Sequence, residues 1–309
     1  MAAPEKSTAL AECPLVSVIV CTYNHSDLLP GCLASLENQT VSKELCEIIV
    51  VDNNSTDDTP AIARRFEQQN SNFRTVIESR PGLARARNRG WQEARGSFVA
   101  YIDDDARAKP EWCERIVAFI RRQPDAAGFG GPYLSCYLSD KPRWYKDEYG
   151  SWSLPGGERP MRGGEFVRGT NMVFKRDVLQ EAKGFDETLG HVGESMAYGE
   201  EPNLHVRLTK MGKTIYYCPS IVVEHLVTPQ KMSVRWMLNS AFRAGSAAPM
   251  MFQKRWPRLR AIAALMKHVI LLPVRLLSFN EPYMQNRILL AFTGIAWHFG
   301  TLVGEKGKR

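Results

Sequence analysis

Residues 98–105 have the sequence FVAYIDDD, an apolar run that ends in three consecutive aspartates. Two earlier stretches have the same form: residues 15–20 (LVSVIV) lead into CTYN at 21–24, and residues 47–51 (EIIVV) lead into Asp52. Short β-branched runs bounded by polar residues are typical of strands that are buried on both faces. The three stretches therefore predict parallel strands whose carboxyl ends carry polar groups.

Helical periodicity separates these strands. We expect a helix that opens at Ser26, a second over Thr56–Gln69 and a third over Leu83–Glu93, with a short strand at Arg74–Glu78. Regular alternation of strands and helices is the pattern of βαβ units. The predicted fold class is α/β, with a Rossmann-like, mostly parallel sheet flanked by helices.

The second half of the chain has a different texture. Residues Pro132–Gly164 are rich in aromatic side chains, Pro and Gly without a clear period, which predicts a long functional loop over a site. Regular pattern then returns. The further elements that we expect are strands at Met172–Phe174, Thr214–Cys218 and Ile221–Glu224 and helices at Asp177–Ala182 and Glu200–Met211.

The basic charge is concentrated at the C-terminal end. Residues 253–309 hold ten Lys and Arg against two Asp and Glu, a net charge of +8, whereas residues 1–252 hold 30 against 31. Arg258–Leu277 has helical periodicity, and Ile288–Val303 is an apolar run shorter than a membrane span. We expect basic amphipathic helices that bind an anionic membrane surface. The alternative is that they pack on the main domain or on a second subunit as a homodimer.

Carboxylates collect where the predicted strands end. Asp52 closes one strand, and Asp103, Asp104 and Asp105 close another. Ligands of open α/β sheets bind outside the carboxyl ends of the strands. Because grouped carboxylates repel one another, they are expected to hold a cation, and oxygen ligands without Cys partners suit Mg²⁺ or Mn²⁺. The alternative is that the aspartates cap turns and helices.

Six segments then give a family resemblance. The chain resembles the family-2 glycosyltransferases, inverting enzymes with a GT-A fold. The matching segments are VSVIVCTYN (16–24), IIVVDNNSTD (48–57), GLARARNRG (82–90), FVAYIDDD (98–105) and KGFDE (183–187), and Gly-Glu-Glu at 199–201 matches the Gly-Glu-Asp of the family with one change. The resemblance covers about residues 14–230 and implies transfer of a sugar from a nucleotide-sugar donor to a hydroxyl acceptor, in a bacterial polysaccharide or glycolipid pathway.

The resemblance also implies a nucleotide site in the first half of the chain. Asp52 would accept a hydrogen bond from the base, and the D-x-D element would hold ribose and a divalent cation, Mn²⁺ or Mg²⁺. Asp105 would be the direct metal ligand, and Asp103 a further one. The residues expected to contact the nucleotide are Thr22, Tyr23, Asn24, Asp52, Arg80, Arg87, Asp103 and Asp104.

A second carboxylate pair, Glu200-Glu201, opens a predicted helix. Acidic residues in a first turn often serve only the helix dipole. The functional alternative is a general base that takes the proton of the acceptor hydroxyl. In the family the second acid has this role and is usually Asp. Here Glu201 is the expected base and Glu200 is its rival.

Three further features concern the metal and the acceptor. His225 follows a predicted strand, and relatives with this layout often have a metal-ligating His there; the alternative is a packed or surface His. The segment Arg168–Asn171, with Thr170 and Asn171, corresponds to a part of relatives that faces the acceptor. Trp144 could stack on a sugar ring or simply pack its loop onto the domain.

These interpretations divide the chain into three parts: a flexible N-terminus at 1–13, a GT-A domain at 14–232 and a basic helical region at 233–309. Seven Cys without a C-x-x-C pair favour a reducing compartment. We therefore expect a cytoplasmic protein, peripheral on the inner face of the membrane, that takes a saccharide or lipid-linked acceptor.

Two other classes of protein compete with this prediction. A nucleotidyltransferase would have a Gly-rich phosphate loop after the first strand, and CTYN at 21–24 is not one. A non-catalytic nucleotide-sugar-binding protein would not need the intact aspartate cluster. Nucleic acid is not an expected partner, because the charge lies in the tail and no recognised binding motif is present.

Overall fold

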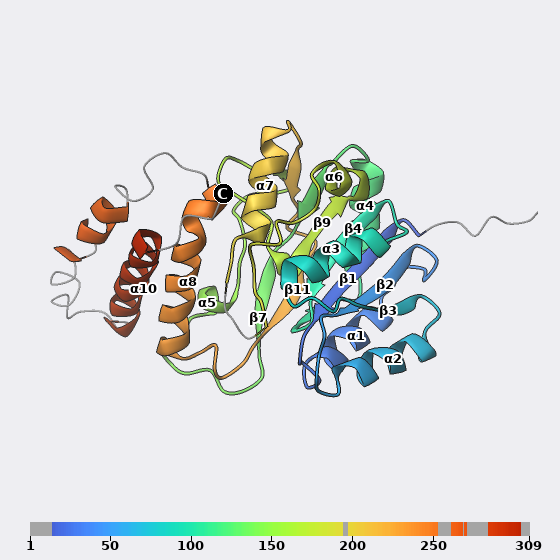
Figure 1. Cartoon of the computed structure of the whole chain (residues 1–309), viewed down its shortest axis with the longest axis horizontal. Helices are drawn as coiled ribbons and strands as arrows, with labels where there is room; N and C mark the ends of the chain where they lie inside the picture. The colour runs from blue at the N-terminus through green and yellow to red at the C-terminus, as the bar shows by residue number, and fades with distance from the viewer. Residues whose placement is uncertain (1–13, 194–196, 253–260, 268, 271–283, 304–309) are drawn as a thin grey trace, which may run out of the picture.

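The computed structural model describes residues 14–193, 197–252, 261–267, 269–270 and 284–303. Its centre is a mixed sheet with helices on both faces (Figure 1). The strands in spatial order are β3 (Phe73–Ile77), β2 (Cys46–Asp52), β1 (Val16–Thr22), β4 (Phe98–Asp103), β9 (Met172–Lys175), β6 (Gly128–Gly130), β10 (Ile215–Tyr217) and β8 (Arg159–Pro160).

The first four strands of this order are parallel, as the alternation of strands and helices predicted. Beyond them the sheet is mixed, because β9 runs antiparallel to both β4 and β6. Alternate residues of each strand point to opposite faces, so β1 buries Val18 on one face and Ile19 on the other. Both faces are therefore apolar, and both must be covered.

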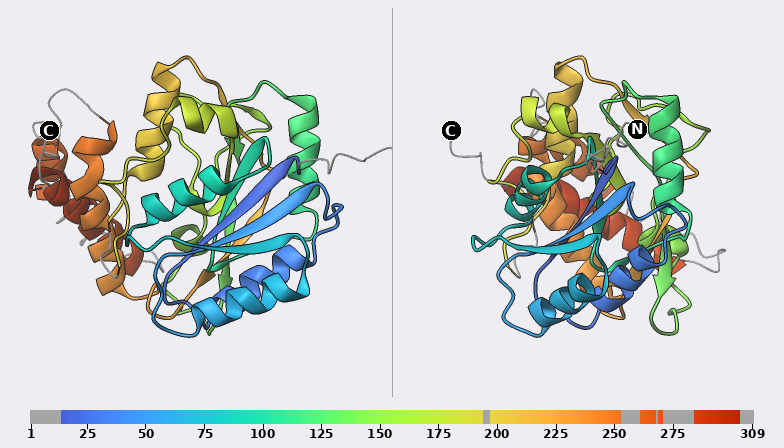
Figure 2. Two further views of the ribbon diagram at one scale, coloured as in Figure 1. Left: turned by 45° about the vertical axis from the view of Figure 1, so that its right-hand side comes forward. Right: turned by 90° about the vertical axis from the view of Figure 1, so that its right-hand side faces the viewer.

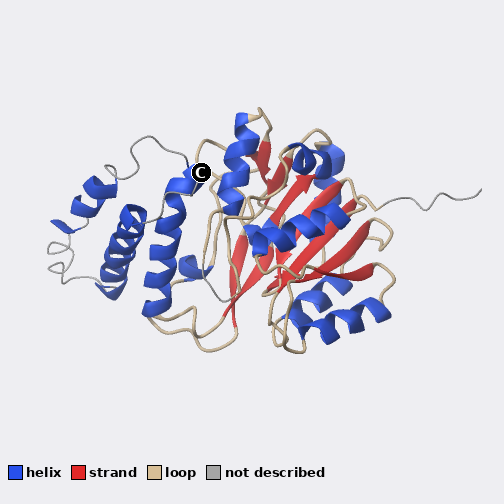
Figure 3. Cartoon of the chain, in the orientation of Figure 1, coloured by secondary structure: helices blue, strands red, loops and turns tan. Residues whose placement is uncertain are grey.

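Helices cover both faces (Figures 2 and 3). Apolar residues of α1, α2 and α4 pack on one face, and those of α3, α6 and α7 pack on the other. Gly90 lets α3 approach β1 closely, since a Cβ there would overlap the side chain of Ile19. The helices are α1 (Leu29–Glu37), α2 (Thr59–Gln69), α3 (Leu83–Glu93), α4 (Trp112–Arg122), α6 (Arg176–Glu181) and α7 (Glu200–Lys210).

A second, smaller sheet lies beside the first and has the order β5-β11-β7. β5 (Ala106–Ala108) starts directly after the aspartates, and it pairs antiparallel with β11 (Val223–Val227). β11 in turn pairs parallel with β7 (Tyr133–Tyr137). This sheet brings the segment after Asp105 against the segment around His225.

The prediction of a patternless loop over Pro132–Gly164 was wrong in part. This segment holds β7, a short helix α5 (Asp147–Gly150) and β8. Tyr145 is buried against Val227 and Met232, so the aromatic residues here form a core of their own. Aromatic rings at irregular spacing have no period, which is why the pattern concealed these elements.

The C-terminal region contains a helix that the sequence interpretation missed. α8 (Val234–Phe252) packs against α7 and against α10 (Met284–Val303), as Figure 1 shows. Helical residues also occur at 261–267 and 269–270, whereas the rest of the predicted helix Arg258–Leu277 lies outside the described residues, as does the N-terminal segment 1–13. No helix in the described part of the chain combines the length and the apolar character needed to span a bilayer.

α8 and α10 contact each other through two glycines. A Cβ at Gly245 would overlap the carbonyl oxygen of Trp297, and one at Gly300 would overlap that of Phe242. The Thr301 hydroxyl also donates to the Gly245 carbonyl oxygen over 3.1 Å. The two helices are therefore in backbone contact, which leaves no room for a larger residue.

We expect Gly245→Ala to destabilise the fold by about 1–3 kcal/mol, because it overpacks a helix contact. In an isolated helix Ala is favoured over Gly by about 1 kcal/mol, so a loss would report the contact and not helix propensity. Urea unfolding followed by circular dichroism measures it. Gly163→Ala is the matched control, since no atom lies within 4 Å of its added Cβ. A Gly245→Ala variant as stable as the wild type would contradict the close packing.

Candidate active site

The polar ends of three adjacent strands lie level with one another. In the parallel registers Thr22 of β1 is opposite Asp52 of β2, and Cys21 is opposite Asp103 of β4. The carboxyl edge of the sheet therefore carries these groups side by side, at the position where open α/β sheets bind ligands.

A cavity of about 950 Å³ opens at this edge. This volume is in the upper part of the range of small-molecule sites. Segments from the whole chain contribute to its walls, from the end of β1 to α10. The lining residues that concern the predicted site are Thr22, Tyr23, Asn24, Arg87, Asp103, Asp104, Asp105, Thr170, Glu200, Glu201 and His225.

Asp103 lies at the end of β4 and has a partner for each carboxylate oxygen. The Thr170 hydroxyl donates to Oδ2 over 2.5 Å, and Arg87 Nη2 lies 3.6 Å from Oδ1. Thr170 comes from a short 3₁₀ turn at Gly169–Asn171, just before β9. The antiparallel pairing of β9 with β4 thus places the predicted acceptor-side segment against the predicted nucleotide side. The role of Asp103 as a metal ligand stays a prediction.

Arg87, on α3, is the centre of a buried ion cluster. Its side chain is 3% exposed, and Nη1 lies 2.9 Å from Glu200 Oε1 and 3.3 Å from Glu201 Oε1. Gly169 lies over the cluster, where a Cβ would overlap both Arg87 and Glu201. One guanidinium therefore contacts acidic side chains from β4 and α7 together, within a closely packed shell.

The two glutamates differ in environment. The side chain of Glu200 is 3% exposed and that of Glu201 is 17% exposed. Burial and the adjacent Glu201 carboxylate raise the pKa of Glu200 to about 8, against the opposing effect of Arg87. Burial disfavours the charged form of Arg87, but Glu201 and Glu200 outweigh it, so its pKa is raised and it stays charged. Glu200 is thus the deep partner of Arg87, and Glu201 is the more accessible acid.

Asp104 lies in the turn between β4 and β5 and pairs with His25. His25 Nδ1 lies 2.9 Å from Asp104 Oδ2. The hydrogen bond to this carboxylate raises the pKa of His25 to about 9, although burial opposes the shift. Both residues line the cavity, so this pair adds a cationic imidazolium to its wall. The sequence interpretation did not select His25.

Asp105 meets His225 and a residue that the sequence interpretation also missed. Asp105 Oδ1 lies 3.5 Å from His225 Nε2, because β5 and β11 are paired. Lys231 Nζ lies 2.6 Å from Asp105 Oδ2 and 3.3 Å from His225 Nε2. Burial raises the pKa of Asp105, but His225 and Lys231 outweigh this, and its pKa lies well below the usual range.

The pair Asp105 and His225 fits a divalent cation. A carboxylate and an imidazole nitrogen converge here on one point, which the ammonium group of Lys231 occupies as a stand-in cation. The described residues hold no group of three or more His, Cys, Asp or Glu arranged for an ion. Two protein ligands are nevertheless sufficient for Mg²⁺ or Mn²⁺ when substrate phosphates and water complete the coordination.

Other predicted nucleotide residues are held by internal contacts. Asn24 Oδ1 accepts from the Thr56 backbone over 2.8 Å, and buried Asp52 accepts from the Ser55 backbone over 3.1 Å. Asp52 and Arg80 are not among the described residues that line the cavity. Their contacts with a nucleotide stay predictions.

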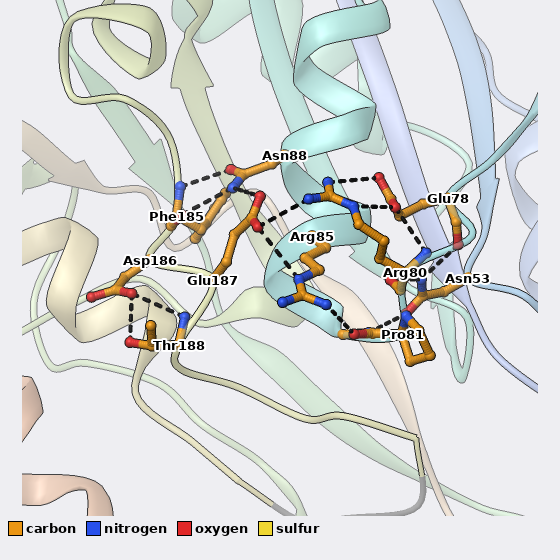
Figure 4. Close-up of polar contacts among 11 residues, drawn as sticks. Asn53, Glu78, Arg80, Pro81, Arg85, Asn88, Phe185, Asp186, Glu187 and Thr188 are labelled. Atoms are coloured by element: carbon orange, nitrogen blue, oxygen red, sulfur yellow. Dashed lines mark hydrogen bonds and ion pairs between the residues drawn. The ribbon is translucent and has the colours of Figure 1, made fainter. Parts of the chain in front are cut away.

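Arg80 belongs to a polar network that Figure 4 shows beside the start of α3. It lies 3.0 Å from Glu78 and 3.6 Å from Glu187, and Arg85 also reaches Glu187. Asn88 exchanges hydrogen bonds of 2.9 and 2.8 Å with the backbone of Phe185. The motif at 82–90 is thereby tied to the motif at 183–187, so part of both motifs has a structural role.

Of the three residues predicted to face the acceptor, one lines the cavity and two do not. Thr170 lines the cavity. Asn171 is buried and binds Trp112 Nε1 and two backbone carbonyls. Trp144 packs on Tyr145 with ring centroids 5.6 Å apart and is not among the described lining residues. Contact of Asn171 and Trp144 with an acceptor stays a prediction.

Aromatic residues from elsewhere line the cavity instead. Trp236 of α8 and Trp297 of α10 both contribute, with Tyr149, Phe166 and Tyr198. The Tyr198 hydroxyl is 2.9 Å from Ser240 Oγ of α8. No motif marks these positions in the sequence; amphipathic periodicity of residues 234–252 is the signal that could have found α8.

The chain is similar in sequence to known glycosyltransferases. The model of Glycosyl transferase family 2 matches residues 17–182. The glucosyl-dolichyl phosphate glucuronosyltransferase of Haloferax volcanii is 27% identical over 239 residues, covering 74% of this chain and 75% of that protein. An uncharacterized glycosyltransferase of Haemophilus influenzae is 32% identical over 229 residues, 73% of this chain and 69% of its own length.

A solved structure shows the same fold. The mannosyltransferase PcManGT from Pyrobaculum calidifontis, in complex with GDP-Man and Mn²⁺, has a TM-score of 0.64 at 22% identity, and the match covers 95% of this chain and 88% of that one. The predicted GT-A architecture, a mostly parallel sheet between helices with a helical C-terminal part, is confirmed.

We expect Arg87→Met to lower the free energy of unfolding by about 3–5 kcal/mol, because it leaves buried carboxylates without their cation. Buried acids without a partner have raised pKa values, so they bind protons in the folded state that the unfolded state has released. Stability is then lost as pH rises, and the deficit should be smaller at pH 5 than at pH 8. Denaturant unfolding at both pH values measures it.

Arg89→Met is the matched control on the same helix. Arg89 is 43% exposed and pairs with Glu93 one turn away, so its removal should cost less than about 1 kcal/mol. Equal losses for the two variants, or a deficit of Arg87→Met that does not grow with pH, would contradict the buried cluster.

Proposed function

The chain belongs to glycosyl transferase family 2, and we propose that it transfers a sugar from a nucleoside diphosphate sugar to a hydroxyl acceptor with inversion at the anomeric carbon. The protein is a glycosyltransferase by family. The proposal concerns the donor class, the stereochemistry and the residues involved. It is supported above all by one observation: Glu201 and the aspartates of residues 103–105 line the same cavity.

The proposed donor half is the wall made by the ends of β1 and β4. Thr22, Tyr23 and Asn24 would contact the nucleoside, and Asp103 and Asp104 would lie at the ribose. The complex of PcManGT with GDP-Man and Mn²⁺ supports a nucleotide-sugar donor for this fold. The cavity is also large enough to hold a nucleotide sugar.

Asp105 and His225 would hold Mn²⁺ or Mg²⁺. When bound, the cation would act as a Lewis acid toward the diphosphate that departs as the glycosidic bond breaks. His25, which pairs with Asp104 over 2.9 Å, lies on the same wall. These groups together would bind and orient the anionic part of the donor.

Glu201 is the proposed general base. It is the more accessible acid of the pair, and Arg87 holds it in place 3.3 Å away. Its carboxylate would take the proton of the acceptor hydroxyl as that oxygen attacks the anomeric carbon. A single base without an enzyme nucleophile gives one in-line displacement, which inverts the configuration. Glu200 is better suited to positioning, because Arg87 binds it deep in the protein.

The proposed acceptor half is formed by the aromatic wall that includes Trp236 and Trp297. Flat aromatic faces suit the apolar faces of sugar rings, which supports a saccharide or lipid-linked acceptor. The similarity to a glucosyl-dolichyl phosphate glucuronosyltransferase is in keeping with such an acceptor. A role in bacterial polysaccharide or glycolipid synthesis is part of this proposal.

We retain the peripheral membrane association on an inner, cytoplasmic face as a proposal. Exposed apolar side chains in the described C-terminal residues support it, and the net charge of residues 253–309 favours an anionic surface. These side chains include Ile262, Met266, Val269 and Ile270. The boundary between a GT-A domain at 14–232 and a C-terminal region also stays a proposal, because α8 takes part in the cavity. Formation of a homodimer is likewise part of the proposal.

The function is tested by turnover on a panel of UDP-, GDP- and dTDP-sugars, followed as release of the nucleoside diphosphate. We expect one donor class to react, excess EDTA to abolish turnover, and NMR of the product to show inverted anomeric configuration. Retained configuration would overturn the mechanism. Full turnover in EDTA would overturn the metal role. Release of sugar 1-phosphate, with the nucleoside monophosphate left on the acceptor, would indicate a nucleotidyltransferase.

We expect Glu201→Gln to reduce kcat by about a hundredfold or more with donor affinity little changed, because Gln keeps the shape and removes the basicity. Glu200→Gln is the matched control. It retains a hydrogen-bonding partner for Arg87, so its kcat should fall far less. Steady-state kinetics and donor titration of both variants measure this. If Glu200→Gln alone stops turnover, the assignment of the base is off by one residue.

A further inference from the structure

Lys231 lies at the point that a divalent cation would occupy. Its ammonium nitrogen is 2.6 Å from Asp105 Oδ2, 3.3 Å from His225 Nε2 and 3.4 Å from the Leu226 carbonyl oxygen. An ammonium group has three donors, and three polar atoms surround this one within 3.4 Å. Two of the three are the groups that would ligate the metal.

We propose that Lys231 is the resident counter-ion of Asp105 in the donor-free enzyme, and that a divalent cation binds only by displacing its ammonium group. This inference rests on the metal site of the proposed function. The two cations cannot share the site, because both need the same carboxylate and like charges in contact repel strongly. Lys231 therefore competes with the metal for Asp105.

The side chain of Lys231 can leave without moving its backbone. Lys231 lies on the turn between β11 and α8, and the next residue, Met232, is buried against Tyr145 and Val227. Met232 N also donates to the backbone of the same turn over 3.2 and 3.3 Å. The turn is thus anchored, whereas the lysine stem has four rotatable carbons and lines the cavity.

The displaced ammonium group would stay in the cavity, where the donor diphosphate is its natural partner. Without a donor it keeps Asp105, whose Oδ2 lies 2.6 Å away. With a donor, the phosphate oxygens offer ligands to the metal and a new partner to Lys231 together. Metal and donor should therefore bind cooperatively, and the metal should bind weakly to the donor-free enzyme.

The deciding experiment titrates Mn²⁺ alone into the donor-free full-length protein by calorimetry or by loss of the free-ion EPR signal. We expect Lys231→Met to bind Mn²⁺ at least tenfold more tightly than the wild type, because the competitor is gone. Lys231→Arg should stay close to the wild type. Structural damage would weaken metal binding, so a gain in affinity is specific to displacement.

Three further variants support the interpretation. Lys109→Met removes one charge from a lysine that pairs with Glu224, the neighbour of His225 on β11, and should leave Mn²⁺ affinity close to that of the wild type. Adding Asp105→Asn to Lys231→Met should abolish the gain. Lys231→Gln should show the same gain in Mn²⁺ affinity. If Lys231→Met is too unstable for titration, the rise of Tm on adding Mn²⁺ can be compared instead, and it should be larger in the variant than in the wild type.

Mn²⁺ affinity of Lys231→Met and Lys231→Gln equal to or below that of the wild type would overturn the inference. If turnover of the wild type is then still abolished by EDTA, the metal role in the proposed function stands and the competition alone is wrong. If turnover persists in EDTA, the metal role fails as well. The two failures are thus distinguished by the same protein preparation.

Discussion

The buried guanidinium of Arg87 is the interaction on which the rest of the site depends. Asp103 comes from the end of β4, and Glu200 and Glu201 come from the start of α7, nearly one hundred residues later in the chain. Carboxylates brought so close in a buried place would repel one another without a cation between them. Because Arg87 is buried and remains charged, it stabilises Asp103 and the proposed base Glu201 close to each other.

The backbone is arranged to make this contact possible. Gly169 has no side chain at the point where Arg87 and Glu201 meet, and Gly199 ends the loop before α7 with a φ of +123°. The pair of hydrogen bonds between Asn88 and Phe185 ties α3 to the segment that leads to α7. Motif residues therefore divide between those that face the cavity and those that hold the cavity-facing ones in position.

The second sheet also brings together residues that are far apart in the chain, and here basic groups gather around one carboxylate, that of Asp105. By pairing β5 with β11 it brings His225 to Asp105, and the turn after β11 adds Lys231. α8 follows this turn directly and contributes Trp236 to the cavity, while its contact with α10 brings in Trp297. The helices α8 and α10 are therefore part of the cavity wall.

The sequence alone determined the sheet of β1 to β4, the helices between them and the polar groups at the strand ends, because local periodicity and strand-end chemistry are local properties. It also determined the acid pair and the family. Only the tertiary structure decided that Glu200 is buried and Glu201 more accessible. The two residues are of the same type and adjacent on a helix, so their environments depend on how the helix packs. Lys231, Trp236 and Trp297 have no motif, so their place in the cavity depends on how β11, α8 and α10 pack, which no local pattern encodes.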